Sequence, residues 1–438
     1  MPMQKSLTLG DATWRRGLSF VSGLGMAVFS LLTIQHFFAA NFPSSIWAGA
    51  FCDISAFFNC NSSAYSPIAQ IAGVPLGYFG LVVGVLVLLG ALFPSAPFER
   101  TNRFIAIPNA IGVIALLFYS VFVLKSLCVL CSGYYVFAIL SATLFLRYSG
   151  TPEEGRALVR FLKPSIKYVL TFAVATALGA YSMALFHDAK KQAQAGGVSQ
   201  EIVKQYFSLP VVHSPSVISP YWTAKASERF EDAPIHVIEY SDFLCPDCRY
   251  LSTQLSKLKE EFKGKINISY QFFPLEAACN RVVEKDKHPG ACELSYMAAY
   301  DPAKFQQLHD EIFANFDQAK SPEWRQEFAK RHGLDGALTH QQTRELVDKI
   351  IRTGAEFQPT SDKYAAGIRS TPTMIINGRM IIGTLPYEQL KAIFTALASG
   401  EGKNVSGQQN GKQTFIENWQ DSKGGGCTVE ANAPCTPY

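Results

Sequence analysis

The sequence predicts a membrane all-α part, a four-helix bundle with a fifth connecting helix, followed by a soluble α/β domain with a helical insertion. The first observation is the distribution of charge. Of the 39 Lys and Arg and 35 Asp and Glu, 16 fall in the first 186 residues and 58 in the remaining 252. The second is a set of apolar stretches confined to the first part. The third is a strand, cysteine pair and helix pattern that opens the second part. No basic tract suited to nucleic acid occurs, so no nucleic-acid partner is expected.

Five apolar stretches, none with an Asp, Glu, Lys or Arg, are long enough to cross a hydrocarbon core of ~30 Å, which takes ~20 helical residues. The first could instead be a cleaved signal peptide, but its apolar run exceeds the about 7–15 residues usual for such a core. We therefore expect a multi-pass membrane protein in which residues 17–147 form the bundle. The five stretches are Gly17–Ala40, Val74–Phe93, Phe104–Leu124, Ser126–Leu146 and Tyr168–Phe186.

Lys and Arg in the short connecting segments predict the orientation, because they concentrate in cytoplasmic loops. Ten of the first part's Lys and Arg lie before the first stretch, between the second and third, or between the fourth and fifth, whereas the alternate loops hold only Lys125. Residues 1–16 are therefore predicted to be cytoplasmic, and 148–186 to form a cytoplasmic loop and the fifth membrane helix. Everything after Phe186 is expected outside the cytoplasm.

The ten cysteines form five short-range pairs, and this orientation places all of them outside the cytoplasm. Such spacing in an oxidising compartment suggests disulfide chemistry. The two membrane pairs have alternatives: Cys128 and Cys131 could be small apolar core residues, and Cys52 and Cys60 a static staple. The five pairs are Cys52 with Cys60, Cys128 with Cys131, Cys245 with Cys248, Cys279 with Cys292, and Cys427 with Cys435.

The second part is expected to begin with a linker. His187–Gly197 is polar and rich in small residues, and Ser208–Pro220 carries several prolines and serines, so residues 187–233 are predicted to be an extracytoplasmic linker with loop character. A globular domain is expected over residues 234–399, with a tail over residues 400–438.

The pair Cys245 and Cys248 follows a predicted strand, Ile235–Ser241, and precedes a helical run. At a helix N-terminus the macrodipole and free N–H groups stabilise a thiolate and lower its pKa, so Cys245 is predicted to be the reactive sulfur and Cys248 the resolving one. Asp242 and Asp247 would oppose that lowering. Neither Cys-x-x-Cys motif is followed by His, which argues against c-type haem, and no metal site is expected.

Further elements complete the predicted domain. The run Tyr250–Phe262 is expected to be a helix and Ile266–Phe273 a second strand. A helical insertion is expected over about residues 285–357. The stretch Ser370–Gly383 then predicts a hairpin that turns at its Asn-Gly dipeptide.

Pro372 stands immediately before this hairpin, where a cis-proline would sit. A proline there removes an N–H and would leave Thr371 free to contact a bound peptide. The alternative is an ordinary proline of an edge strand.

From Ile235 to about Ser399 the chain resembles the thioredoxin superfamily. The string Asp242-Phe-Leu-Cys-Pro-Asp-Cys248, the helical insertion and Thr371-Pro372 are similar to its disulfide oxidoreductase A-like branch. The resemblance implies a thioredoxin-like fold for this domain.

The membrane part, about Arg15–Arg147, resembles the vitamin K epoxide reductase family. That family has an outer-loop cysteine pair, a serine six residues after the second cysteine, and a Cys-x-x-Cys that opens its fourth helix. The matching residues here are Cys52, Cys60, Ser66, Cys128 and Cys131, with Gly73-Val-Pro75 and Tyr135 in support. The resemblance implies that Cys131, Ser66 and Tyr135 lie at a quinone, which would be ubiquinone, menaquinone or phylloquinone. For Tyr135 the alternative is an anchor at the membrane interface.

Fusion of the two domains through a fifth helix is the bacterial form of this family. The resemblance implies a quinone-linked thiol:disulfide oxidoreductase of the bacterial inner membrane that forms disulfides in periplasmic or secreted dithiol proteins. Electrons would pass to Cys245 and Cys248, then to Cys60 and Cys52, then to the membrane pair and a quinone, each time by thiolate attack on a disulfide. The alternatives are an outward-directed reductase or isomerase feeder, and a membrane-anchored peptide-binding chaperone without net redox turnover.

Two cysteine pairs gain no role from either resemblance. Cys279 and Cys292 are predicted to form a structural disulfide that closes the segment entering the helical insertion. Cys427 and Cys435 lie in a tail rich in Gly, Asn and Pro. A disulfide there could clip a flexible end or exchange with the Cys245–Cys248 pair.

Overall fold

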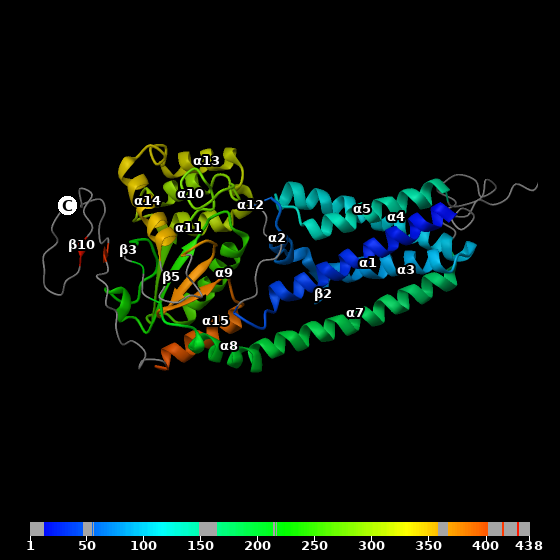
Figure 1. The fold of residues 1–438 in the computed structure, drawn as a ribbon, viewed down its shortest axis with the longest axis horizontal. Helices are drawn as coiled ribbons and strands as arrows, with labels where there is room; N and C mark the ends of the chain where they lie inside the picture. Colours follow the sequence, from blue (N-terminus) through cyan, green and yellow to red (C-terminus); the bar gives the residue numbers. More distant parts are fainter. Residues whose placement is uncertain are drawn as a thin grey trace, which may run out of the picture. The chain divides into compact units, whose positions relative to one another are not determined.

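The chain divides into two compact units, and each is described by itself. The computed structural model describes residues 13–46, 55, 57–148, 164–212, 215, 217–357, 367–401, 414–415 and 427–428. The first unit comprises Met1–Phe42 and Phe57–Gln192, and the second Pro43–Ala56 and Ala193–Tyr438. Figure 1 draws the first as long helices and the second as a sheet with helices around it.

The first unit has a helix at each of the five predicted stretches. Four of these helices are long and apolar enough to cross a membrane. The second, α3, has 17 residues and would span about 26 Å. It starts after the beginning of the predicted stretch, because Val74–Pro75 form a strand, β2, paired with Gln70–Ile71, β1. The helices are α1 (Thr13–Asn41), α3 (Leu76–Leu92), α4 (Ala96–Phe118) with its π-helical continuation η3 (Tyr119–Val123), α5 (Val129–Tyr148) and α7 (Ile166–Ala195).

Helices α1, α3, α4 and α5 pack side by side as a bundle (Figure 1). Glycines let α1 and α3 approach closely. A Cβ on Gly23 would stand 2.6 Å from the backbone nitrogen of Leu88, and one on Gly84 would stand 2.7 Å from that of Ala27. Small residues serve this purpose in membrane helix packing. The apolar window of α7 has no buried residue, as expected for a helix that faces lipid.

The loop after α1 is joined to the start of α5. Phe58 forms a parallel bridge with Leu127, the Asn59 N–H donates to the Leu127 carbonyl at 3.2 Å, and the Ser126 hydroxyl donates to the Asn59 carbonyl at 3.3 Å. The Asn59 side chain then caps a short helix, α2 (Cys60–Ala64), which leads to a 3-10 turn, η2 (Pro67–Ala69). Cys60 and Cys128 each follow a residue of this pairing, so the two cysteines come close together.

A five-stranded sheet organises the second unit, in the order β4 (Trp222–Ala224), β6 (Ile266–Phe272), β5 (Ile235–Ser241), β7 (Thr373–Ile376) and β8 (Arg379–Ile382). Strands β5 and β6 run parallel and the other neighbours antiparallel. The hairpin turn is confirmed: Asn377 and Gly378 both have positive φ, 41° and 77°, as the favoured two-residue turn requires.

Helices cover the sheet (Figure 1). The predicted insertion is helical. Its hydrophobic core includes Phe243, Leu244 and the pair Cys245 and Cys248, here called the redox motif. A second core joins α8, α9 and α15 to the sheet. The helices are α8 (Gly197–Ser208), α9 (Pro246–Glu261), α10 (Ala291–Ala299), α11 (Phe305–Ala314), α12 (Phe316–Ala319), α13 (Pro322–His332), α14 (Gln341–Glu356) and α15 (Tyr387–Ala398). The short elements η5 (Phe230–Asp232), β3 (Val217–Ile218), β9 (Thr414–Phe415) and β10 (Cys427–Thr428) complete the unit.

The prediction of loop character for His187–Gly197 is wrong. Helix α7 continues to Ala195 and α8 starts at Gly197. The residues here are mostly Ala, Lys and Gln, which favour helix, so the polarity of the Lys and Gln side chains reflects contact with water rather than a loop. The globular unit also begins before Pro234, since β4 forms the sheet edge. A three-residue edge strand among prolines and serines carries too little periodicity to be detected.

A segment of the loop that follows α1 also belongs to the second unit. Ile46 is buried in the core that contains α8 and α15. The Pro43 carbonyl accepts hydrogen bonds from the side-chain amides of Gln194, at 3.0 Å, and Gln389, at 2.6 Å. The chain is thus anchored in this unit six residues before Cys52.

Candidate functional site

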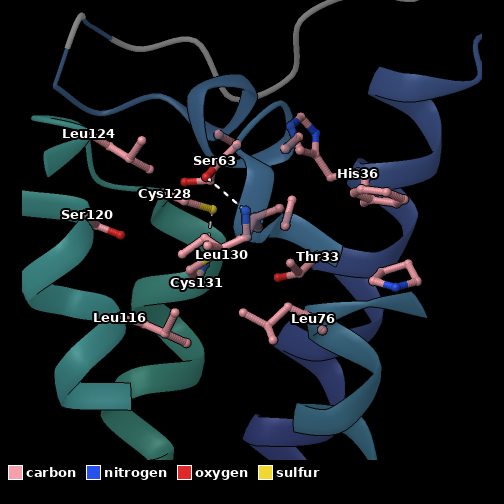
Figure 2. Close-up of a pocket in the computed structure, with 18 of the residues that line it drawn as sticks. Thr33, His36, Ser63, Leu76, Leu116, Ser120, Leu124, Cys128, Leu130 and Cys131 are labelled. Atoms are coloured by element: carbon pink, nitrogen blue, oxygen red, sulfur yellow. Dashed lines mark hydrogen bonds between the residues drawn. The ribbon is translucent and has the colours of Figure 1, made fainter. Parts of the chain in front are cut away.

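The first unit contains a pocket that is lined by three of the predicted redox cysteines, Cys60, Cys128 and Cys131. Figure 2 shows Thr33 and His36 reaching it from α1, Cys128 and Cys131 from the start of α5, and Ser63 from α2. The sequence places these residues in separate stretches, and the bundle brings them together.

The start of α5 presents the membrane cysteine pair. The Cys131 N–H donates to the Cys128 sulfur at 3.2 Å, and both residues are thiols. Free N–H groups at a helix N-terminus favour a thiolate there. Cys131 lies one turn further in, and Thr33 of α1 lines the same pocket.

Cys60 enters the same pocket from the outer loop. It is disulfide-bonded and stands at the start of α2, next to the residue that pairs with Leu127. Its predicted partner, Cys52, lies outside the described residues. The arrangement places a disulfide sulfur of the outer loop in the pocket that also holds the Cys128 and Cys131 thiols.

Polar side chains fix one wall of the pocket. Ser66 caps η2, and its hydroxyl lies 3.4 Å from the Tyr119 hydroxyl. Tyr119 and Ser120 are turned into the pocket where α4 ends as a π-helix, a distortion that is frequent at functional sites. Tyr135 lines the same pocket from α5. Sequence motifs mark Ser66 and Tyr135 but not Tyr119 and Ser120, because a π-turn has no residue signature in an apolar stretch.

A second hollow adjoins the first and shares Cys131, Tyr135 and Thr33 with it. It continues between α1, α3 and α4 toward Asn109 and Val113. The combined space is mostly apolar with a few hydroxyl groups, which suits a planar apolar ring with polar substituents. The residues present therefore fit a quinone.

In the second unit, Cys245 and Cys248 stand at the junction of β5 and α9. Cys245 is the N-cap of α9 and Pro246 is its first residue. Both sulfurs are buried thiols. The Asp242 N–H donates to the Cys248 sulfur at 3.4 Å. The predicted order of strand, cysteine pair and helix is confirmed.

Thr371 and Pro372 lie beside this pair. Their peptide bond is cis, as expected, and the Cys245 thiol donates to the Thr371 carbonyl at 3.3 Å. The sequence places these residues 126 positions apart, and β7 brings them together because it pairs with β5. Contact of Thr371 with a substrate peptide stays a prediction.

Glu239 is a buried carboxyl group of β5 that no sequence motif marks. Burial raises its pKa to about 7, while Ser241 and Lys259 act in the opposite direction. Burial also raises the pKa of the nearby Tyr270, and the charges of Glu239 and Cys248 add to that shift. The sequence does not mark Glu239 as a buried ionisable group, because the apolar residues around it predict only a core strand.

We expect Glu239 to make the second unit less stable as the pH rises. The folded protein holds a proton on Glu239 between its ordinary pKa near 4.5 and about 7, so stability falls as the pH rises through that window, by about 3 kcal/mol in full. The Glu239→Gln variant should gain about that much over wild type in unfolding free energy between pH 5 and pH 8. Denaturant unfolding measures it, with the exposed Glu327→Gln variant as control. Parallel pH profiles for wild type and Glu239→Gln would contradict the assignment.

The remaining cysteine predictions have different outcomes. Cys279 and Cys292 form a disulfide, with Cα atoms 6.0 Å apart, as predicted. Cys427 begins β10, but its side chain and Cys435 lie outside the described residues, so their pairing stays a prediction.

Comparison with known proteins identifies both units. Residues 18–146 match the model of the vitamin K epoxide reductase family, and residues 230–396 match a thioredoxin family model. Both matches agree with the resemblances that the sequence motifs carried.

Curated relatives extend this agreement. A probable disulfide bond formation protein D of Bacillus cereus is 35% identical over 158 residues, which cover 34% of this chain and 68% of that protein. A Na(+)/H(+) antiporter NhaA 1 of Mycolicibacterium gilvum is 26% identical over 173 residues, which cover 39% of this chain. The chain spans only 26% of the antiporter's length.

Among solved structures, alpha-DsbA1 of Wolbachia pipientis is 14% identical, and the match covers 42% of this chain and 94% of that one with a TM-score of 0.33. The assignment of the second unit rests on the family match and on the order of its elements rather than on this superposition.

Proposed function

Since the chain belongs to the disulfide bond formation protein D family and carries a vitamin K epoxide reductase domain as well, we propose that it oxidises dithiols outside the cytoplasm and passes the electrons to a membrane quinone. It is a membrane protein and a thiol–disulfide oxidoreductase. The observation that carries the proposal is that Cys60, Cys128 and Cys131 line one pocket.

The first step takes place at the thioredoxin-like domain. A substrate thiolate attacks the Cys245 sulfur of the Cys245–Cys248 disulfide, and Cys248 leaves as a thiolate. The second substrate thiol then displaces Cys245 from the mixed disulfide. The substrate loses two electrons and two protons and gains a disulfide, and Cys245 and Cys248 become thiols. The cis-proline loop that accepts the Cys245 thiol at Thr371 supports a peptide-binding role there.

The second step returns Cys245 and Cys248 to the disulfide. The Cys245 thiolate attacks Cys60 in the outer-loop disulfide, Cys52 leaves, and Cys248 displaces Cys60. Cys52 and Cys60 are then thiols. The Cys52 thiolate attacks Cys128 of the membrane disulfide, Cys131 leaves as a thiolate, and Cys60 displaces Cys128, so Cys128 and Cys131 become thiols. The pairing of Phe58 with Leu127 holds the loop that carries Cys60 next to the start of α5, which supports exchange between the loop cysteines and the membrane pair.

The third step re-oxidises the membrane pair, Cys128 and Cys131. A quinone, as the final substrate, takes two electrons and two protons. Cys131 lines both hollows, so it is the sulfur best placed to donate, with Cys128 closing the disulfide behind it. Ser66 and Tyr135 would orient the ring through their hydroxyls, and Tyr119 holds Ser66 in place. The apolar walls would exclude water.

The charge distribution supports a location in the membrane and the proposed side for the thioredoxin-like domain. Lys and Arg cluster in segments predicted to be cytoplasmic, which would put α7 in the orientation that delivers the thioredoxin-like domain to the periplasm of a bacterial inner membrane. Its substrates would then be periplasmic or secreted dithiol proteins.

Trapping the mixed disulfide between the two domains tests the proposed order. In a Cys248→Ala variant, Cys245 can attack Cys60 but cannot be released, so a Cys245–Cys60 disulfide should accumulate. Peptide mapping of the unreduced full-length protein by mass spectrometry measures it. The matched Cys245→Ala variant should give no link between the domains. A Cys245–Cys52 link, or none, would contradict the order.

A further inference from the structure

A buried acid–imidazole pair stands directly behind the Cys245–Cys248 motif. The Oδ2 atom of Asp242 lies 2.7 Å from Nδ1 of His288, and both side chains are fully buried. No motif in the sequence marks His288, and the proposed electron path does not use it.

Asp242 is bonded on every side. Its Oδ1 accepts the Leu244 N–H at 2.7 Å and its Oδ2 accepts the Leu275 N–H at 2.6 Å. Its own backbone N–H donates to the Cys248 sulfur. The carboxylate therefore fixes the turn that leads to Cys245, and the same residue contacts the resolving sulfur.

The position of His288 is set by a loop that a disulfide closes. Its N–H donates to the Leu275 carbonyl at 3.2 Å. The Glu276 carboxylate accepts the N–H groups of Gly290, at 3.0 Å, and Cys292, at 2.8 Å. The Cys279–Cys292 disulfide joins the two ends of this segment. These hydrogen bonds and the disulfide therefore restrict movement of His288 away from Asp242.

The direction of the hydrogen bond between His288 and Asp242 follows from the chemistry of the two groups. A carboxylate accepts, so the imidazole must donate through Nδ1. The Nε2 atom of His288 is buried and has no hydrogen-bond partner among the described residues. Within the described part of the chain, the side chain of His288 is therefore joined to the redox motif by its hydrogen bond to Asp242.

We propose that His288 is a positioning residue for thiol–disulfide exchange at Cys245 and Cys248, and that the Cys279–Cys292 disulfide serves to hold it against Asp242. The proposal rests on the thiol–disulfide part of the proposed function and not on the quinone. A donor from Asp242 to the Cys248 sulfur favours the reduced form of the pair. Loss of His288 removes one of the three donors to the Asp242 carboxylate and loosens that contact, so the reduced form becomes less favoured.

The test is the redox equilibrium of Cys245 and Cys248 with glutathione in the full-length protein, read by alkylation and mass spectrometry. His288→Leu should lower the equilibrium constant for reduction about tenfold, which corresponds to about 30 mV. Asn places an amide N–H where Nδ1 stands, so His288→Asn should restore most of that loss. His332→Leu removes a comparable imidazole–carboxylate contact, 2.9 Å to Glu311, and should leave the equilibrium as in wild type.

The outcomes separate positioning from a purely structural role. If His288→Leu is folded and keeps the wild-type equilibrium, the proposal is overturned. If His288→Leu does not fold, a Cys279→Ala, Cys292→Ala double variant opens the loop instead and should shift the equilibrium in the same direction. An unchanged equilibrium in that folded variant overturns the proposal. Failure of wild type to exchange with glutathione would contradict the proposed function itself, whereas loss of quinone reduction alone would not affect this test.

Discussion

Replacing Cys131 by alanine is expected to reduce quinone-dependent dithiol oxidation at least about 10³-fold, because it removes the sulfur proposed to deliver electrons to the quinone. Cys131 lines both hollows of the first unit, and its N–H contacts the Cys128 sulfur. The measurement is the loss of quinone absorbance with the purified protein, supplied with a reduced peptide dithiol and, separately, with dithiothreitol. Both rates should fall to the background.

The Cys131→Ala variant should retain thiol–disulfide exchange in the thioredoxin-like domain. Cys245 and Cys248 should exchange with glutathione as in wild type, because that domain has its own core. Thr143→Ala changes an exposed side chain of the same helix and should leave both quinone rates intact. A Cys131→Ala protein that reduces quinone at the wild-type rate would refute the assignment of the membrane pair.

Replacing Cys245 by serine is expected to have an equally large effect on only one of the two donors. Oxidation of the peptide dithiol should fall at least about 10³-fold, because Cys245 is the sulfur that substrate thiolates are proposed to attack. Dithiothreitol is small enough to reduce the outer-loop disulfide directly, so quinone reduction with dithiothreitol should remain. The ratio of the two rates is therefore the informative quantity.

Thr253→Ala, on the same helix and exposed, is the matched control and should keep both rates. Equal loss of the peptide and dithiothreitol rates in Cys245→Ser would mean that Cys245 supports the membrane site in some other way. Equal retention would mean that substrates bypass the thioredoxin-like domain.

The sequence was sufficient for the elements with strong local signals. Strand Ile235–Ser241 is found with its predicted bounds, because an apolar run bordered by a cysteine motif leaves little ambiguity. The Asn377-Gly378 turn was equally clear, since few other dipeptides take positive φ twice. The helix after Cys245 starts earlier than predicted, at Pro246, because proline is well suited to a first helical turn.

The site was less accessible to sequence reasoning wherever tertiary contacts decide it. The Cys279–Cys292 spacing predicted a disulfide, but nothing in it shows that the closed loop presses His288 against Asp242, 46 positions away. Tyr119 enters the pocket through a π-turn, and the polar stretch after Phe186 continues a helix that a reading of polarity assigned to a loop. In each case the deciding interaction joins residues that are distant in the chain or depends on backbone geometry without a residue signature.

The most direct test of the central claim is a stoichiometry measured on the full-length protein in lipid nanodiscs with a quinone and a reduced peptide dithiol. The account predicts that one quinol forms for each peptide disulfide, since each carries two electrons. A folded protein that exchanges disulfides without consuming quinone would contradict it and favour a peptide-binding role. Oxidation of added quinol with reduction of a peptide disulfide would contradict the direction of electron flow.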